Sequence, residues 1–211
     1  MFQSCTKEQS PPSQRDEYHI SNEFKRYTAF QIGSYWVYQL LNTESTIIDT
    51  VWVEGTKFEN RIHTLGSVQY FYDAIELTLS SKEIGLIKGE ITSGPALSPG
   101  QKAETYRVYF NDGKYLSVFI PYHPLDSLVH LGGVEGDYSN MAFSSQLAIN
   151  QKLYNDVYET RIISEPGTAQ SVMHEYFFAK DVGCVKFSYQ SAGQPTKEEW
   201  VLVSSTLIPL E

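Results

Sequence analysis

The chain has 211 residues, with 16 Lys and Arg against 25 Asp and Glu and a formal net charge of -9. Phosphate contacts need clustered basic residues, so this balance argues against a nucleic-acid partner and against an anionic membrane surface. Aromatic residues make up 14% of the chain, including 15 Tyr, and such residues favour the half-buried surfaces of sheets. The composition predicts one β-rich domain of ordinary size with no nucleic-acid partner.

The first 28 residues are predicted to precede the folded domain. Met1-Phe2-Gln3-Ser4-Cys5 is followed by a polar stretch with Pro11-Pro12, and it resembles the end of a lipobox, the signal before the lipid-bearing cysteine of bacterial lipoproteins. The resemblance implies that Cys5 carries a lipid anchor and that residues 1–28 are a signal remnant and flexible tether. No charged region and no apolar region precede it. Either the start codon has been assigned too late, or a soluble protein carries a chance cysteine.

A short amphipathic helix or an irregular docking segment is predicted just before the domain. Ile20, Phe24 and Tyr27 recur at helical spacing. Ser21 and Asn22 are available as its N-terminal cap. No run of apolar residues in the chain approaches the roughly 18 that a transmembrane helix needs.

The folded domain is predicted to begin with a strand over Tyr35–Leu41. After a turn at Gly33, Trp36, Tyr38 and Leu40 alternate with the residues between them, which is the period-two pattern of a strand. Both faces carry bulky residues, so a helix, another sheet, a partner or a ligand is expected to cover the second face. Residues 29–211 are read as a single β-rich domain.

Turn signals divide the rest of the domain into further predicted strands. Joined mainly by short turns, these strands predict a mainly β fold: a single antiparallel meander that forms a curved sheet, half-barrel or barrel, with at most one or two short helices. The strands are Ile47–Glu54, Phe58–Thr64, Val68–Leu79, a weak Ile84–Ile91, Leu153–Ile163, Val172–Ala179, Cys184–Tyr189 and Glu199–Thr206.

For one further hairpin, around Asp112-Gly113, the positions of the apolar residues predict how the two strands pair. A two-residue turn at Asp112-Gly113 would send the apolar residues of the two arms to opposite faces. A three-residue loop, Asn111-Asp112-Gly113 with Gly113 in the left-handed conformation, places Val108 opposite Leu116 on one face. We predict the three-residue loop.

Three short patterns give the domain a family resemblance. They are Phe30-x-x-Gly33-x-x-Trp36-x-Tyr38, Leu153-Tyr154-Asn155-Asp156-Val157-Tyr158, and Tyr176 to Lys186 followed by Trp200-Val201-Leu202. This layout resembles uncharacterised envelope lipoproteins of the Bacteroidota type and, more loosely, the half-barrel lipoprotein carriers that hold acyl chains in a concave sheet. The resemblance implies a β-rich protein anchored by lipid in the cell envelope, at the outer membrane or in the periplasm, and no particular reaction.

Residues 123–130 are the only place where two histidines and a carboxylate fall close together. If residues 125–130 formed a helical turn, Asp126 and His130 would share a face at a spacing that can hold a metal. Two ligands are not a metal site, so we expect no metal and no cofactor, and we read His123, Asp126 and His130 as polar loop residues. The alternative is a secreted hydrolase that uses one of these three residues.

The remaining reactive side chains have structural explanations. Cys184 lies in an apolar run and is predicted to be a buried small hydrophobe. His174 alternates with Val172 and Tyr176, which favours a structural histidine. No serine stands in a Gly-x-Ser-x-Gly elbow, so we predict no catalytic residue.

The aromatic residues are enough to fill a core and enough to line a cavity for an apolar or sugar-like ligand. We therefore expect a lipid-anchored, non-enzymatic envelope protein that binds an apolar or other small ligand or a partner protein, although no ligand-binding residue can be assigned. Two alternatives stay open. One is a secreted hydrolase with its site in the 121–146 loop, and the other is a structural subunit of a surface assembly, which would expose an apolar patch.

Overall fold

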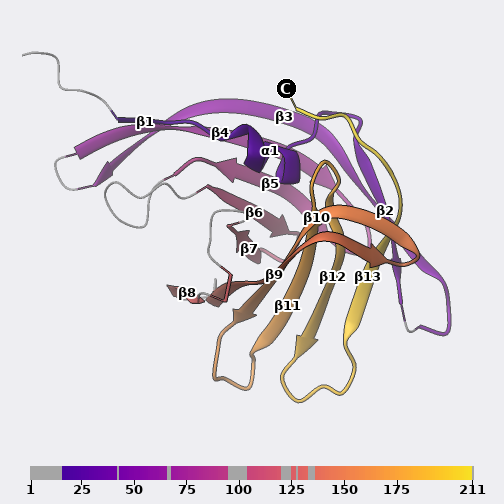
Figure 1. The fold of residues 1–211 in the computed structure, drawn as a ribbon. Coiled ribbons are helices and arrows are strands. Elements are labelled where there is room, and N and C mark those ends of the chain that lie inside the picture. Colours follow the sequence, from indigo (N-terminus) through magenta and orange to yellow (C-terminus); the bar gives the residue numbers. More distant parts are fainter. Residues whose placement is uncertain are drawn as a thin grey trace, which may run out of the picture.

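The molecule is built around one β-sheet that curls on itself (Figure 1). The computed structural model describes residues 16–41, 43–65, 68–94, 104–119, 125–126, 128–132 and 136–210. Its one helix and its strands confirm the predicted mainly β fold. In chain order they are β1 (Asp16–Tyr18), α1 (Asn22–Thr28), β2 (Tyr35–Leu40), β3 (Ile47–Leu65), β4 (Val68–Ser80), β5 (Leu86–Thr92), β6 (Thr105–Phe110), β7 (Tyr115–Val118), β8 (Leu128–Gly132), β9 (Gly136–Ile149), β10 (Lys152–Ser164), β11 (Val172–Ala179), β12 (Gly183–Ser191) and β13 (Glu198–Thr206).

The strand order follows the chain except at one junction, as expected of a meander. Across the sheet it runs β7-β6-β5-β4-β3-β2-β13-β12-β11-β10-β9-β8, all antiparallel, and β1 adds a short parallel pairing to β4. At the junction, β2 pairs with β13, with Tyr35 opposite Thr206. The two ends of this path come from the middle of the chain, where the ring of Phe119, just after β7, lies 5.1 Å from that of Tyr138 in β9. The sheet is therefore nearly closed into a barrel, which leaves little edge exposed.

The alternation predicted for β2 separates an inner face from an outer face. Trp36 and Tyr38 point inward and are 7% and 4% exposed. On the outer face, the ring of Tyr35 packs on that of Trp52 from β3, with centroids 4.5 Å apart. The inward residues of all strands form one core, because the curvature of the sheet brings its concave faces together.

Residues 47–65 form one long strand, so the prediction of two separate strands split at Gly55-Thr56 is wrong. Strand β3 shifts register between Val53 and Gly55 where it pairs with β4. A Cβ at position 55 would lie 2.9 Å from Oγ1 of Thr78. Glycine thus marks a bulge inside a continuous strand instead of a turn between two strands.

The predicted register of the β6–β7 hairpin is confirmed. Val108 pairs with Leu116, and Gly113 has φ of 83°. The backbone N–H of Phe110 donates to the carbonyl of Lys114 at 2.9 Å, which closes the three-residue loop.

The helical turn considered for residues 125–130 is not formed, because residues 128–132 form β8. This strand pairs with β9, with Leu128 opposite Ser139. The structure also extends β9 back to Gly136, into the segment that the sequence suggested to be irregular. The i, i+4 geometry that would bring Asp126 and His130 together is therefore absent.

Helix α1 closes one end of the barrel. The Ser21 hydroxyl accepts from the backbone N–H of Phe24 at 3.1 Å, as an N-cap does, and donates to the buried carboxylate of Glu104 at 2.9 Å. The helix is tied to the β11–β12 turn, because Lys180 bonds Glu23 at 2.8 Å. Together with the pairing of β1, these contacts show that residues 16–28 pack on the sheet, although they fall inside the 1–28 segment predicted to be a signal remnant and tether.

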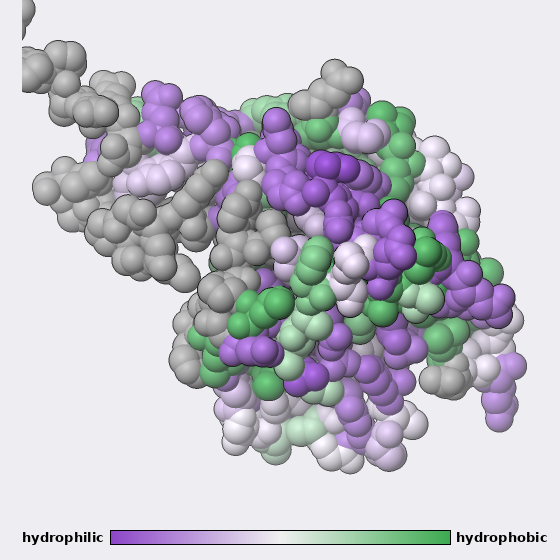
Figure 2. Space-filling view, in the orientation of Figure 1, coloured by the Kyte–Doolittle hydropathy of each residue, from purple (hydrophilic) through white to green (hydrophobic). Residues whose placement is uncertain are grey.

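Hydrophilic and hydrophobic residues are interspersed over the face of the molecule seen in Figure 2, with hydrophilic residues gathered over α1. Within the described ranges, no helix has the length and apolar character needed to cross a membrane.

Candidate functional site

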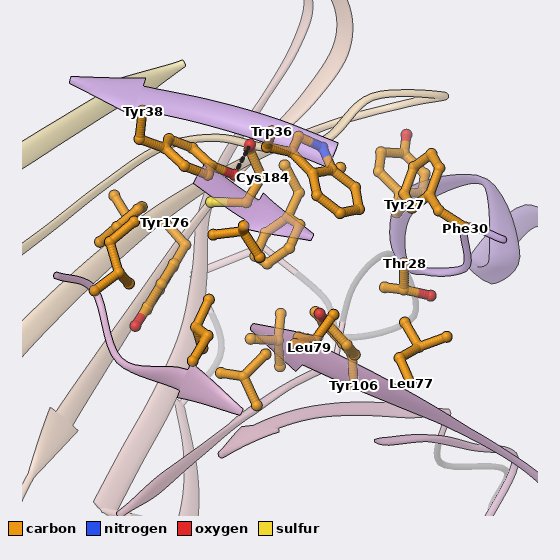
Figure 3. A pocket seen from close by; sticks show the side chains of 18 of the residues that line it. Tyr27, Thr28, Phe30, Trp36, Tyr38, Leu77, Leu79, Tyr106, Tyr176 and Cys184 are labelled. Carbon is orange, nitrogen blue, oxygen red and sulfur yellow. Dashed lines mark hydrogen bonds between the residues drawn. The ribbon is translucent and has the colours of Figure 1, made fainter. Parts of the chain in front are cut away.

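The concave side of the sheet encloses an apolar inner cavity of about 70 Å³. Its wall comes from strands on both halves of the sheet and from α1 (Figure 3). Tyr27 and Thr28 of α1 line the cavity at the closed end of the barrel. None of the lining residues carries a charge. The lining residues are Tyr27, Thr28, Phe30, Trp36, Tyr38, Val51, Leu77, Leu79, Ile84, Leu86, Tyr106, Val108, Phe110, Val118, Tyr176, Phe178, Gly183, Cys184 and Phe187.

A larger outer cavity of about 640 Å³ adjoins the inner one. Ile84, Phe110, Tyr176 and Phe187 line both cavities, so the two spaces meet at these side chains. The volume falls in the range of roughly 300–1,000 Å³ that small-molecule sites occupy. The outer cavity is also lined by the β6–β7 loop, the start of β11 and the inner faces of β12 and β13.

Two cross-strand rows of side chains form the floor of the outer cavity. In the first row, Tyr176 pairs with Phe187 and Phe187 with Trp200. Their ring centroids lie 6.0 and 6.2 Å apart at interplanar angles of 18° and 12°. In the second row, His174 pairs with Tyr189. Cross-strand neighbours on one face of a sheet touch each other, so the floor is a continuous aromatic surface.

Two hydrogen bonds from β2 fix the inner wall. The indole Nε1 of Trp36 donates to the carbonyl of Val182 at 2.7 Å, and the hydroxyl of Tyr38 donates to the carbonyl of Cys184 at 2.7 Å (Figure 3). They reach past β13 to the start of β12, where Gly183 has φ of 85°. A Cβ at that position would lie 3.2 Å from the ring of Phe30, so glycine permits the close approach of this wall.

The turn between β4 and β5 reaches the rim of the outer cavity and is held by Asp49. The buried carboxylate of Asp49 accepts from the backbone N–H groups of Lys82, Glu83 and Ile84 at 3.1, 2.9 and 2.8 Å. Ile84 lines both cavities, so this carboxylate positions part of the wall. A charged acceptor that satisfies several backbone donors is a strong local restraint.

Burial keeps His174 of the outer cavity and Cys184 of the inner cavity uncharged at neutral pH. Burial, with a smaller effect from the Lys114 ammonium, lowers the pKa of His174 to about 4. Burial also raises the pKa of the Cys184 thiol to about 12, which leaves it protonated and weakly nucleophilic. Among the described residues, no hydrogen bond is made to the His174 ring, which lies in the wall of the outer cavity.

The residues singled out in the sequence do not come together. Cys5 and His123 lie outside the described residues. Asp126 is exposed, next to β8, and only the backbone of His130 is described, opposite Asp137 in β9. In the described part of the chain, no group of three His, Cys, Asp or Glu side chains is placed to hold a metal ion.

Sequence reasoning missed Asp49, although the sequence carries a signal for it. Asp49, Val51 and Val53 alternate along β3, and all three are buried. A carboxylate in the inward register of a strand must find donors. No such signal marks Lys114, which reaches the outer cavity only through the fold of the hairpin.

Comparisons with known proteins give no family for this chain. No family matches its sequence, and no curated protein matches either. Two solved structures are similar over 85% of the chain. One is a predicted exported protein with a YmcC-like fold from Bacteroides fragilis (11% identity, TM-score 0.35, 98% of that chain covered). The other is a predicted lipoprotein from Parabacteroides distasonis (9% identity, TM-score 0.36, 97% covered). Likenesses this remote do not establish a family, a function or a location in the cell.

Proposed function

We propose that the barrel binds a small, largely apolar ligand in the outer cavity. The observation that carries the proposal is a space of about 640 Å³ with an aromatic floor, open at its rim and next to an apolar inner cavity. A barrel that served only as a packed core would fill this space with side chains. Apolar cavities with a few polar groups are the usual form of small-molecule sites.

The side chains around the cavity favour binding over conversion of the ligand. The Cys184 thiol stays protonated because burial raises its pKa to about 12. Nucleophilic catalysis needs a base within hydrogen-bond reach of the nucleophile, and none of the described residues bonds the imidazole of His174. We therefore propose a non-enzymatic role.

We also propose that the protein acts in the cell envelope, held there by a lipid on Cys5. The support is the lipobox-like Met1 to Cys5 and the polar residues that follow it. The intact mass of the chain isolated from its host tests this placement, because acylation adds a defined mass to Cys5. An unmodified Cys5 in the membrane fraction would contradict it.

The binding proposal is tested by filling the rim of the cavity. Ser191 lies at the end of β12 in the lining of the outer cavity and is exposed. Ser191→Trp places an indole in the opening, and we expect the affinity for the uncharged fluorescent probe N-phenylnaphthylamine to fall at least about tenfold, which corresponds to about 1.4 kcal/mol.

The matched control is Ser204→Trp, because Ser204 is also exposed but lines neither cavity. It should leave the affinity for the probe unchanged. If the wild-type chain does not bind the probe, or if both variants weaken binding equally, the outer cavity is not the binding site.

A further inference from the structure

Several polar groups of the cavity walls have no partner among the described residues. They include the hydroxyls of Tyr106 and Tyr176 and the imidazole of His174. Tyr176 is only 8% exposed, and it lies where the two cavities meet. A polar group in a cavity wall needs a hydrogen-bond partner, from water or from a ligand. A ligand in the cavity can supply the missing partner.

Two other polar side chains of the outer cavity wall are already paired. The indole Nε1 of Trp200 donates to Glu198 at 3.2 Å, and the ammonium of Lys114 lies 3.1 Å from the carboxylate of Asp112. Of the three groups without a partner, Tyr106 lines only the inner cavity, His174 lines only the outer cavity, and Tyr176 lies at their junction. In Figure 3, Tyr106 of β6 and Tyr176 of β11 line the inner cavity from opposite halves of the sheet.

The charges around the cavity disfavour an anion at the junction. The inner cavity is lined without any charged side chain, and a buried anion without a partner is strongly destabilised. At the rim, three carboxylates (Glu83, Asp112 and Glu165) face one ammonium (Lys114), which gives 1 − 3 = −2 formal charges. The ligand group that reaches the tyrosines should therefore be uncharged.

A tyrosine hydroxyl can donate or accept a hydrogen bond, and we assign the Tyr176 hydroxyl as the donor to an uncharged acceptor of the ligand. An ester or amide carbonyl is an uncharged acceptor, and the aromatic row that ends at Trp200 gives its hydrocarbon chain an apolar surface. The outer cavity of about 640 Å³ has the volume of roughly twenty water molecules. That size suits an amphiphile with one chain of about twelve carbons.

We propose that the outer cavity binds an uncharged single-chain acyl ester whose carbonyl oxygen accepts a hydrogen bond from the Tyr176 hydroxyl. This inference rests on the proposed function. The chain lies along Tyr176, Phe187 and Trp200, and the polar end of the ester faces the rim. Contact with the apolar walls favours binding of any apolar chain. The Tyr176 hydroxyl favours an ester over a carboxylate of equal chain length.

The test measures displacement of N-phenylnaphthylamine from the full-length chain by two compounds with the same chain, monolauroylglycerol and laurate. We expect the wild-type chain to bind the ester at least about tenfold more tightly than the carboxylate. Tyr176→Phe removes only the hydroxyl and should weaken ester binding about five- to tenfold, an effect typical of one lost hydrogen bond. The affinity of each variant for the probe is measured first, so that displacement gives its affinity for each compound, and a far-UV circular dichroism spectrum like that of the wild type shows that the variant is folded.

Tyr72→Phe is the matched control, because Tyr72 lies in β4 and lines neither cavity. It should bind both compounds as the wild type does. Equal binding of ester and carboxylate, or an unchanged ester affinity in Tyr176→Phe, would overturn the inference and leave the binding proposal standing. Failure of the wild type to bind the probe at all would instead remove the binding proposal.

Discussion

At the scale of single residues, the cavity wall contains polar groups at positions where an apolar residue would pack more easily. His174 is the clearest case, because its ring stacks on Tyr176 with an interplanar angle of 9° while its pKa is lowered to about 4. The alternation of β11 indicated the inward direction of this side chain. The alternation could not show that a cavity lies in front of the His174 side chain, because the opposite wall of that cavity comes from strands that are distant in sequence.

His174 should make stability depend on pH. The unfolded chain protonates this residue below its ordinary pKa of 6.5, whereas the folded chain does so only near 4. The stability contributed by His174 is therefore fully present above 6.5 and is lost as pH falls from 6.5 towards 4, by at most about 3 kcal/mol. Urea unfolding at a series of pH values measures this slope.

His174→Phe should flatten the slope of the unfolding free energy in that window. His63→Phe is the control, because His63 lies in β3 outside both cavities. A His174→Phe slope identical to that of the wild type would contradict the assigned cause.

At the scale of elements, the sequence predicted best where both partners of a pair lie close in the chain. The β6–β7 register followed from the alternation on two arms joined by a short loop. Strands β8 and β9 were missed because Gly132 and Gly136 interrupt the apolar pattern, although the two glycines pair with each other in the sheet. The bulge at Gly55 was taken for a turn for a similar reason, since a glycine within a strand and a glycine between strands look alike in sequence.

Two glycines with left-handed backbones should respond very differently to substitution. Gly113 has φ of 83° with nothing within 4 Å of an added Cβ, whereas at Gly136, with φ of 72°, a Cβ would lie 2.0 Å from the carbonyl oxygen of Ile163. Gly113→Ala should cost only the backbone strain, about 1 kcal/mol. Gly136→Ala should cost at least about 3 kcal/mol, because the β9–β10 backbones must separate.

Urea unfolding of the two variants measures the difference. Equal losses of stability would show that the close packing of β9 against β10 at Gly136 is not as the structure describes.

At the scale of the whole molecule, composition predicted a β-rich domain, and the strands joined by short turns predicted a curved antiparallel sheet. The covered face of β2 turned out to be the inner wall of a cavity. What composition could not predict is the junction of β2 with β13, which places Trp36 and Tyr38 within reach of the carbonyls of Val182 and Cys184. The cavity exists because this junction closes the sheet and α1 covers one end. It is therefore a property of long-range pairing and not of any local motif.

Native mass spectrometry of the full chain, isolated from its own host under mild conditions, tests the central claim that this barrel carries a ligand. We predict a bound mass that is lost on denaturation and that is reduced or absent in Ser191→Trp, whose indole fills the rim of the outer cavity. The inference on ligand class predicts that the released compound is an uncharged acyl ester. A folded wild-type chain that shows only the mass of its polypeptide and of any lipid on Cys5 would contradict the account.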